Sequence, residues 1–203
     1  ATDHRYMIRA EDALDEDPVM YIGMDSHGLV QTAPREACDS LLDLCCGSGV
    51  QGIVASRYAG HVVAVDINPR AIRFARFNAQ FNGVTNHEVR EGSLYDVVVG
   101  MRFDAILANP PFVPSPEANL KFRDGGATGE NILRAIVEAA PAHLNPAGRL
   151  CIVTDLVDVA NYESKLASWL PGVDGIGAIL TTADRDEILF SVPHCHAPFA
   201  QSF

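Results

Sequence analysis

Two aspartates flank a glycine-rich segment early in the chain, and their spacing suits the binding of a nucleoside. The apolar run that contains Asp43 leads into Gly47-Ser48-Gly49-Val50-Gln51-Gly52, a pattern typical of a strand, a tight turn and a helix start. Glycines at such a bend let the backbone pass close to a ligand and leave amide N–H groups free. Asp66 ends the next apolar run, where a carboxylate can accept both hydroxyls of a ribose. A nucleoside-containing cofactor is therefore predicted.

Asp43 distinguishes two classes of cofactor. The segment 47–52 also spells G-x-G-x-x-G, the pattern of enzymes that hold the pyrophosphate of a dinucleotide. A carboxylate just before the turn would repel a pyrophosphate, but it would attract the ammonium group of a methionine moiety. We therefore expect S-adenosylmethionine rather than NAD(P). The structural alternative is that Asp43 only caps or braces the loop.

The most specific signal is Asn109-Pro110-Pro111-Phe112, which follows the apolar run 103–108. In an open α/β sheet, ligands bind at the carboxyl ends of the strands. Two prolines in this place could simply end the strand, since neither can donate to a sheet ladder. An amide directly before them and an aromatic ring directly after them favour a substrate site.

These segments resemble class I S-adenosylmethionine-dependent methyltransferases. Residues 47–52 are similar to motif I of that class, and residues 63–68 (Val-Ala-Val-Asp-Ile-Asn) to its acidic motif. Residues 109–112 resemble motif IV of enzymes that methylate glutamine amides, adenine N6 or guanine N2. From about residue 40 to 155, the chain is most similar to release-factor glutamine methyltransferases and the small-methyltransferase-domain group.

The resemblance implies roles for particular residues. The Asn109 side-chain oxygen and the Pro110 carbonyl would accept hydrogen bonds from a substrate –NH₂ while Phe112 packs on its plane, which aligns the nitrogen with the donor methyl. Asp25 and Ser26 lie in a segment similar to one that covers the cofactor. The residues implied to contact the cofactor are Asp43, Cys45, Gly47, Gly49, Asp66, Ile67, Ser93, Leu94 and Asn109. Many relatives carry glycine in place of Cys45 and aspartate in place of Ser93.

Alternating apolar runs and helical patterns predict the scaffold: a doubly wound α/β fold whose mostly parallel seven-stranded sheet closes with a C-terminal antiparallel hairpin in 175–192. We expect a flap, extension or short strand over 1–38 and the cofactor domain over 39–203. On the helix from Pro69, the stripe of Phe74, Phe77 and Phe81 is expected in the core. The predicted strands are 40–45, 61–65, 87–90, 103–108 and 149–154, and the predicted helices are 50–58, 69–82, 130–143 and 158–169.

Composition argues against several classes of partner. The formal charge is −11, from 26 acidic and 15 basic residues, which disfavours a nucleic-acid partner. Arg70, Arg73 and Arg76 are interpreted as a solvated helix face. The sequence shows no secretory leader pattern and no long apolar run, so a cytoplasmic protein without a membrane span is expected. The five cysteines are expected to be reduced, and no metal site is expected at residues 194–196 (His-Cys-His).

The leading hypothesis is N-methylation of a planar amide or amino nitrogen on a small molecule or a protein. A small molecule is modestly favoured, because the separate N-terminal substrate domain of bacterial release-factor enzymes has no counterpart of adequate length here. The alternatives are an NAD(P)-dependent oxidoreductase, a nucleic-acid base N-methyltransferase, or a non-catalytic scaffold that activates a partner. The presence of Asp43, Asp66 and Asn109 together favours an active enzyme. No oligomeric state is predicted.

Overall fold

The structure, a computed structural model, describes residue 2 and residues 18–114, 125–126, 128–155, 159–173, 178–181 and 187–190. The chain divides into two compact units, Ala1–Asp155 and Leu156–Phe203. Every candidate site residue lies in the first unit. Residues 194–196, where no metal site is expected, lie outside the described residues.

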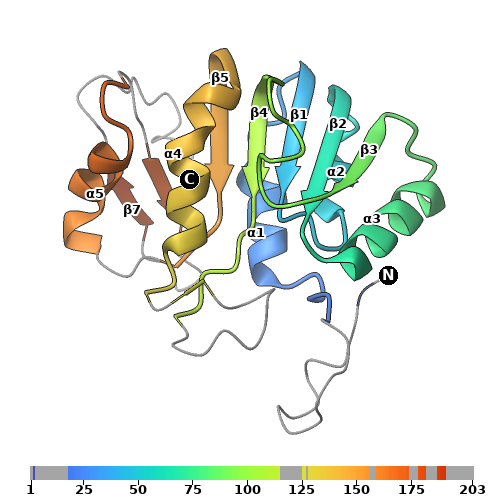
Figure 1. The fold of residues 1–203 in the computed structure, drawn as a ribbon, viewed down its shortest axis with the longest axis horizontal. Helices are drawn as coiled ribbons and strands as arrows, with labels where there is room; N and C mark the ends of the chain where they lie inside the picture. Colours follow the sequence, from blue (N-terminus) through green and yellow to red (C-terminus); the bar gives the residue numbers. More distant parts are fainter. Residues whose placement is uncertain are drawn as a thin grey trace, which may run out of the picture. The chain divides into compact units, whose positions relative to one another are not determined.

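A parallel sheet of five strands in the order β3-β2-β1-β4-β5 forms the centre of the first unit (Figure 1). The chain order reverses between β1 and β4, and the crevice outside such a switch point is where open α/β sheets bind ligands. Leu44 pairs with Ala108, so the segments after β1 and β4 begin side by side. The strands are β1 Cys38–Leu44, β2 Ala59–Asp66, β3 His87–Glu91, β4 Phe103–Ala108 and β5 Leu144–Ile152.

Helices cover both faces of this sheet. Helices α1 (Met24–Thr32), α2 (Val50–Ala55) and α3 (Pro69–Phe81) pack on one face, where Leu29 and Ala55 share a cluster with Leu41. Helix α4 (Asn131–His143) packs on the other face, where Ile136 joins a cluster with Leu42. Neighbouring strand residues therefore point to opposite layers, as the pleat requires.

Helix α3 shows why its sequence forms a helix at this place. Asn68 caps its first turn by accepting the Arg70 N–H at 2.9 Å, and Pro69 occupies a position where its missing N–H has no cost. One face of the helix packs on the sheet, and its residues Ala71, Ile72, Ala75 and Ala79 are all buried.

The expected burial of the phenylalanine stripe on α3 is wrong for two of its members. Phe77 is 54% exposed and Phe81 is 79% exposed, and their rings stack with centroids 5.9 Å apart. The sheet covers only the alanine face of the helix, so side chains rotated away from that face remain in solvent.

The strands and helices predicted for the first unit are confirmed with shifted ends. Strand β5 begins at Leu144, five residues before the predicted Arg149, and its pairing with β4 is irregular between Phe103 and Ala105. Ala147, with φ +63°, lies in this early part of β5. Helix α1 was not predicted, because the sequence suggested a flap, extension or short strand over residues 1–38.

In the second unit, a short 3-10 helix, η2 (Val159–Asn161), precedes α5 (Tyr162–Trp169). Strands β6 (Ala178–Thr181) and β7 (Glu187–Phe190) pair antiparallel as a separate two-stranded sheet. The predicted seven-stranded sheet is therefore not confirmed. Residues 182–186, which connect the two strands, lie outside the described residues, so the hairpin stays a prediction. None of the helices that the structure describes is long and apolar enough to cross a bilayer.

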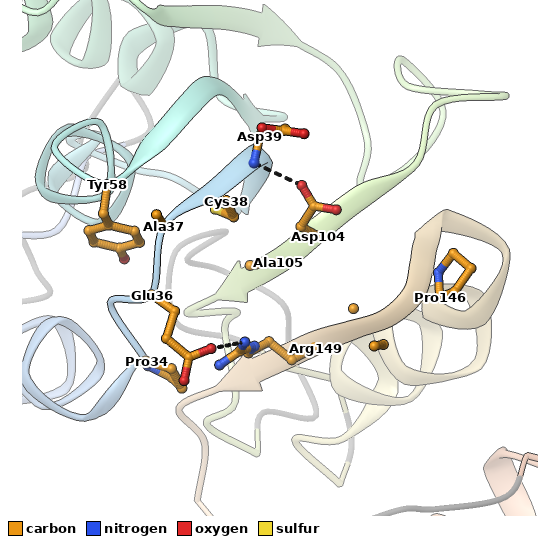
Figure 2. Close-up of a pocket in the computed structure, with 12 residues that line it drawn as sticks. Pro34, Glu36, Ala37, Cys38, Asp39, Tyr58, Asp104, Ala105, Pro146 and Arg149 are labelled. Atoms are coloured by element: carbon orange, nitrogen blue, oxygen red, sulfur yellow. Dashed lines mark hydrogen bonds and ion pairs between the residues drawn. The ribbon is translucent and has the colours of Figure 1, made fainter.

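A cavity of about 270 Å³ lies at the opposite end of the sheet, beside the first residues of β1 and β4 (Figure 2). Three of its charged side chains are engaged: Arg149 forms an ion pair with Glu36, and Asp104 accepts hydrogen bonds from the Asp39 and Ser40 N–H groups at 3.0 Å. The ion pair joins the segment before β1 to β5, and the hydrogen bonds join β1 to β4. The cavity is thus far along the strands from the Asn109 segment, and we assign it a structural role.

Candidate active site

The glycine bend after β1 turns through three residues in the left-handed region. Cys45, Gly47 and Gly49 have φ values of +56°, +53° and +80°. A Cβ on Gly47 would meet no atom within 4 Å, so there is open space beside the bend. Cys45 is the one member of the three with a side chain, and left-handed backbone costs a non-glycine residue about 1–2 kcal/mol. Glycine at this position would remove the strain.

Asp43 lies beneath this bend and is almost completely buried, at 1% exposure. Its Oδ2 accepts the Gly52 N–H at 2.8 Å, which ties the end of β1 to the first turn of α2. Burial raises the pKa of Asp43 to about 7, and the charge of Asp66 acts in the same direction, while the Gly52 hydrogen bond opposes them. The bracing role that the sequence left open is therefore present, and the ammonium role stays a prediction.

Asp66 joins the ends of β1, β2 and β3. Its Oδ2 accepts the Gly47 N–H and its Oδ1 accepts the Asn68 N–H, at 2.8 and 2.9 Å. Its carbonyl accepts the Gly92 N–H at 2.9 Å. Burial raises the pKa of Asp66, and these carboxylate hydrogen bonds lower it in part. Each carboxylate oxygen keeps a lone pair with which it could accept a ribose hydroxyl.

The other implied cofactor contacts surround Asp66. Ile67 is 56% exposed, so its side chain is available to pack against a ring. Ser93 is exposed and Leu94 half-buried, and both follow Gly92 in the turn after β3. Leu94 has φ +46° and packs at the border of the core, which fixes the path of this turn. The bend after β1 and the segments after β2 and β3 thus lie side by side, as a nucleoside site requires.

Asn109 follows β4 at the same edge of the sheet and is half-buried, between the buried Ala108 and Pro110. Its Nδ2 donates to Ser26 Oγ at 3.3 Å, and no described residue donates to its Oδ1. The aromatic side chain of Phe112 is half-buried. Ser26 lies in the segment that resembles a cofactor-covering region, and no sequence pattern predicted its contact with Asn109.

Negative charge dominates this edge of the sheet. Burial raises the pKa of Asp25, and the charge of Asp155, which follows β5, raises it further. Together with Asp43 and Asp66, they make the edge attractive to a cation and repulsive to a pyrophosphate. The electrostatics therefore agree with the distinction that Asp43 suggested.

Two side chains near the bend, the buried Gln51 and the half-buried His87, were not singled out by the sequence. Gln51 Nε2 and both ring nitrogens of His87 have no hydrogen-bond partner among the described residues. Burial lowers the pKa of His87 to about 4, helped by the charge of His61, so its imidazole is neutral at physiological pH. His87 packs against Gly52. This contact joins β3 to α2, so no local sequence pattern could predict it.

The close packing at Gly52 leads to a stability prediction. A Cβ at this position would lie 2.6 Å from His87 Nε2 and 3.0 Å from Asp43 Oδ2, so Gly52→Ala is expected to destabilise the fold by about 1–3 kcal/mol. Gly28→Ala in α1 is the matched control, because a Cβ there meets nothing within 4 Å. That change should stabilise the helix by about 0.5–1 kcal/mol. Urea unfolding of both variants gives the comparison, and equal effects would contradict the packing account.

The strand order defines a Rossmann-like α/β fold, and the glycine bend and the acidic side chains lie at the edge of its sheet where such folds bind ligands. The methyltransferase small domain family matches residues 22–176, and the chain belongs to this family. The resemblance to class I methyltransferases is therefore confirmed.

Two curated relatives carry more specific names. The chain is 30% identical over 189 residues to the release factor glutamine methyltransferase of Cereibacter sphaeroides, a match that covers 86% of the chain and 64% of the relative. It is 34% identical over 196 residues to the ribosomal protein uL3 glutamine methyltransferase of Bradyrhizobium diazoefficiens, with 83% and 60% covered. The chain thus spans less than two thirds of the length of these relatives.

A solved structure shows the same fold. The ribosomal protein L11 methylase of Lactobacillus delbrueckii subsp. bulgaricus superposes with a TM-score of 0.56 at 22% identity, and the match covers 78% of this chain and 71% of the other. The family implies S-adenosylmethionine as the methyl donor. The shared fold and the donor that the family implies therefore agree with the glycine bend and the acidic side chains described above.

Proposed function

We propose that this protein methylates the side-chain amide nitrogen of a glutamine residue in a protein substrate, with S-adenosylmethionine as the methyl donor. The observation that carries the proposal is the half-buried Asn109, whose Oδ1 faces no described donor at the edge of the sheet where Asp43 and Asp66 lie. The curated relatives are named as glutamine methyltransferases of release factor and of ribosomal protein uL3. Their names favour a protein amide over the small molecule that the sequence modestly favoured.

The described residues fit the donor. The open space beside Gly47, with φ +53°, allows close approach to the backbone, as a bound nucleoside needs. Asp66 would hold the ribose, Ile67 would pack on the adenine, and Ser93 and Leu94 would border it. Asp43, Cys45, Gly47 and Gly49 would lie along the methionine part. When bound, S-adenosylmethionine supplies an electrophilic methyl group on a positively charged sulfur.

The protein's own contribution is to hold the acceptor nitrogen in line. The Asn109 Oδ1 and the Pro110 carbonyl would accept the two N–H bonds of the substrate amide, and Phe112 would cover the amide plane. Such fixed acceptors stabilise the positive charge that develops on the nitrogen, and they orient its lone pair. The nitrogen then loses one proton to solvent, so no strong general base is required.

The alternatives fit less well. A nicotinamide cofactor would place a pyrophosphate against Asp43 and Asp66, and Asp25 and Asp155 would add to the repulsion. A nucleic-acid substrate would meet a chain with net charge −11. A substrate from the translation apparatus would also agree with the cytoplasmic location that the sequence led us to expect.

The direct test is transfer of a labelled methyl group. Purified protein is incubated with methyl-labelled S-adenosylmethionine and either a release factor or ribosomal protein uL3, each produced without glutamine methylation. We expect the label in one of these proteins, and mass spectrometry should place one methyl on a glutamine. Calorimetry with S-adenosylhomocysteine and with NADH accompanies the assay. Binding of NADH alone, or label that enters only small molecules in a parallel incubation with cell extract, would overturn the proposal.

A further inference from the structure

Ser26 contacts the Asn109 motif from an element that comes 83 residues earlier in the chain. Its Oγ accepts the Asn109 Nδ2 hydrogen at 3.3 Å, and Ser26 is only 9% exposed. The hydrogen bond therefore lies between a buried hydroxyl and a half-buried amide, where water competes little with it.

Helix α1 holds Ser26 firmly in this place. Leu29 lies three residues after Ser26, so both side chains point from the same face of the helix. Leu29 is 3% exposed and packs in one cluster with Ala105 and Leu107 of β4, the strand that ends just before Asn109. The hydroxyl and the amide are thus both fixed to β4, and in Figure 1 α1 runs beside the end of that strand.

An asparagine amide has two chemically different ends. If the nitrogen end faced a substrate –NH₂, two donors would oppose each other, whereas the oxygen end offers the acceptor that this group needs. Ser26 takes up one end of the amide, and it is the nitrogen end.

We propose that Ser26 is a positioning residue that holds the Asn109 amide with its oxygen toward the substrate nitrogen. The inference rests on the function proposed above. Ser26 thereby tunes the site to substrates that donate hydrogen bonds, such as primary amides and amines, because only these complement the Oδ1 atom and the Pro110 carbonyl. Ser26 acts through Asn109 and touches no reacting atom.

The test compares Ser26→Ala, Ser26→Cys and Ser26→Thr in the full chain, with the glutamine substrate that the wild type methylates. We expect kcat to fall about tenfold in the alanine and cysteine variants, because each lacks a strong acceptor for Nδ2. The threonine variant keeps the hydroxyl and should recover to within about threefold of wild type. Affinity for S-adenosylhomocysteine should stay within about twofold in all three.

A second set of variants, made in an Asn109→Asp protein, separates the orientation of the Asn109 amide from simple packing of Ser26. In Asn109→Asp, the carboxylate has two equivalent oxygens, so its orientation no longer matters. Adding Ser26→Ala to this variant should lower kcat by less than about twofold, because coupled residues give non-additive effects. Thr32→Ala is the matched control: it removes another α1 hydroxyl, which donates to the Gly28 carbonyl at 2.8 Å, and it should leave kcat unchanged.

Three results would overturn the inference: failure of threonine to restore kcat, an equal loss in the aspartate background, or a parallel loss of S-adenosylhomocysteine affinity in Ser26→Ala. Each would mean that Ser26 supports the fold or the cofactor rather than the amide. A wild-type protein that methylates no glutamine would instead contradict the proposed function.

Discussion

Asn109→Ala is expected to lower kcat by about 100- to 1000-fold, the cost of removing one preorganised polar group that meets developing charge. Affinity for S-adenosylhomocysteine should change by no more than about threefold, because the other implied cofactor contacts remain. The physical reason is that Oδ1 is the acceptor for the substrate –NH₂, and alanine offers nothing in its place. Single-turnover transfer of labelled methyl measures the first effect, and calorimetry measures the second.

Two further variants serve as comparisons for Asn109→Ala. Asn109→Asp keeps an acceptor and should retain measurable turnover, between the alanine variant and wild type. Asn82→Ala, at the exposed end of α3, removes an asparagine that only donates to the Asn78 carbonyl, so its turnover should match wild type. If Asn109→Ala turned over normally, the chemistry would have to lie elsewhere in the chain.

Asp43→Asn is expected to act in opposite directions on stability and on cofactor affinity. Burial raises the pKa of Asp43 to about 7 in the folded protein, above its ordinary value of 3.8. The folded state therefore binds the proton more tightly than the unfolded chain does. Stability from this group is complete below the ordinary value, falls as the pH rises between the two values, and is lost above about 7. Asparagine removes the charge but keeps an oxygen for the Gly52 N–H.

Urea unfolding at two pH values measures the first effect. From about pH 5.5 to about pH 8, the wild type should lose on the order of 2 kcal/mol of stability relative to Asp43→Asn. At about pH 8 the variant should bind S-adenosylhomocysteine about 10- to 100-fold more weakly, because a charged partner of the ammonium group is gone. Wild-type affinity should also rise as the pH passes through about 7. A variant that is no more stable at the higher pH, with unchanged affinity, would show that Asp43 only braces the loop.

The sheet and its order of helices were predictable because each signal is local. Residues 41–44, 62–65 and 106–108 are continuous apolar runs apart from Asp43, as strands covered on both faces require, and all of them are buried. The glycine bend and the diproline follow such runs directly. Their position at one edge of the sheet then follows from parallel topology alone.

The features that could not be predicted from the sequence depend on contacts between distant segments. Helix α1 contains Gly28 and follows Gly23, which weaken any local helical signal, and it is fixed by packing of Leu29 on the sheet. The early start of β5 was hidden by Asn145-Pro146-Ala147-Gly148, a segment that resembles a turn. The contact of Ser26 with Asn109 joins residues with no informative spacing. The exposure of Phe77 and Phe81 depends on which side of α3 the sheet leaves uncovered.

In the proposed reaction, a methyl group passes from a sulfonium donor to an amide nitrogen held by Asn109. The most direct measurement uses ¹³C-methyl S-adenosylmethionine and a protein substrate labelled with ¹⁵N in its glutamine side chains, followed by NMR of the product. We predict a one-bond coupling between the new carbon and the side-chain nitrogen, present with wild type and formed about 100- to 1000-fold more slowly with Asn109→Ala. A methyl carbon bonded to oxygen or carbon instead, or transfer at the wild-type rate in Asn109→Ala, would contradict it.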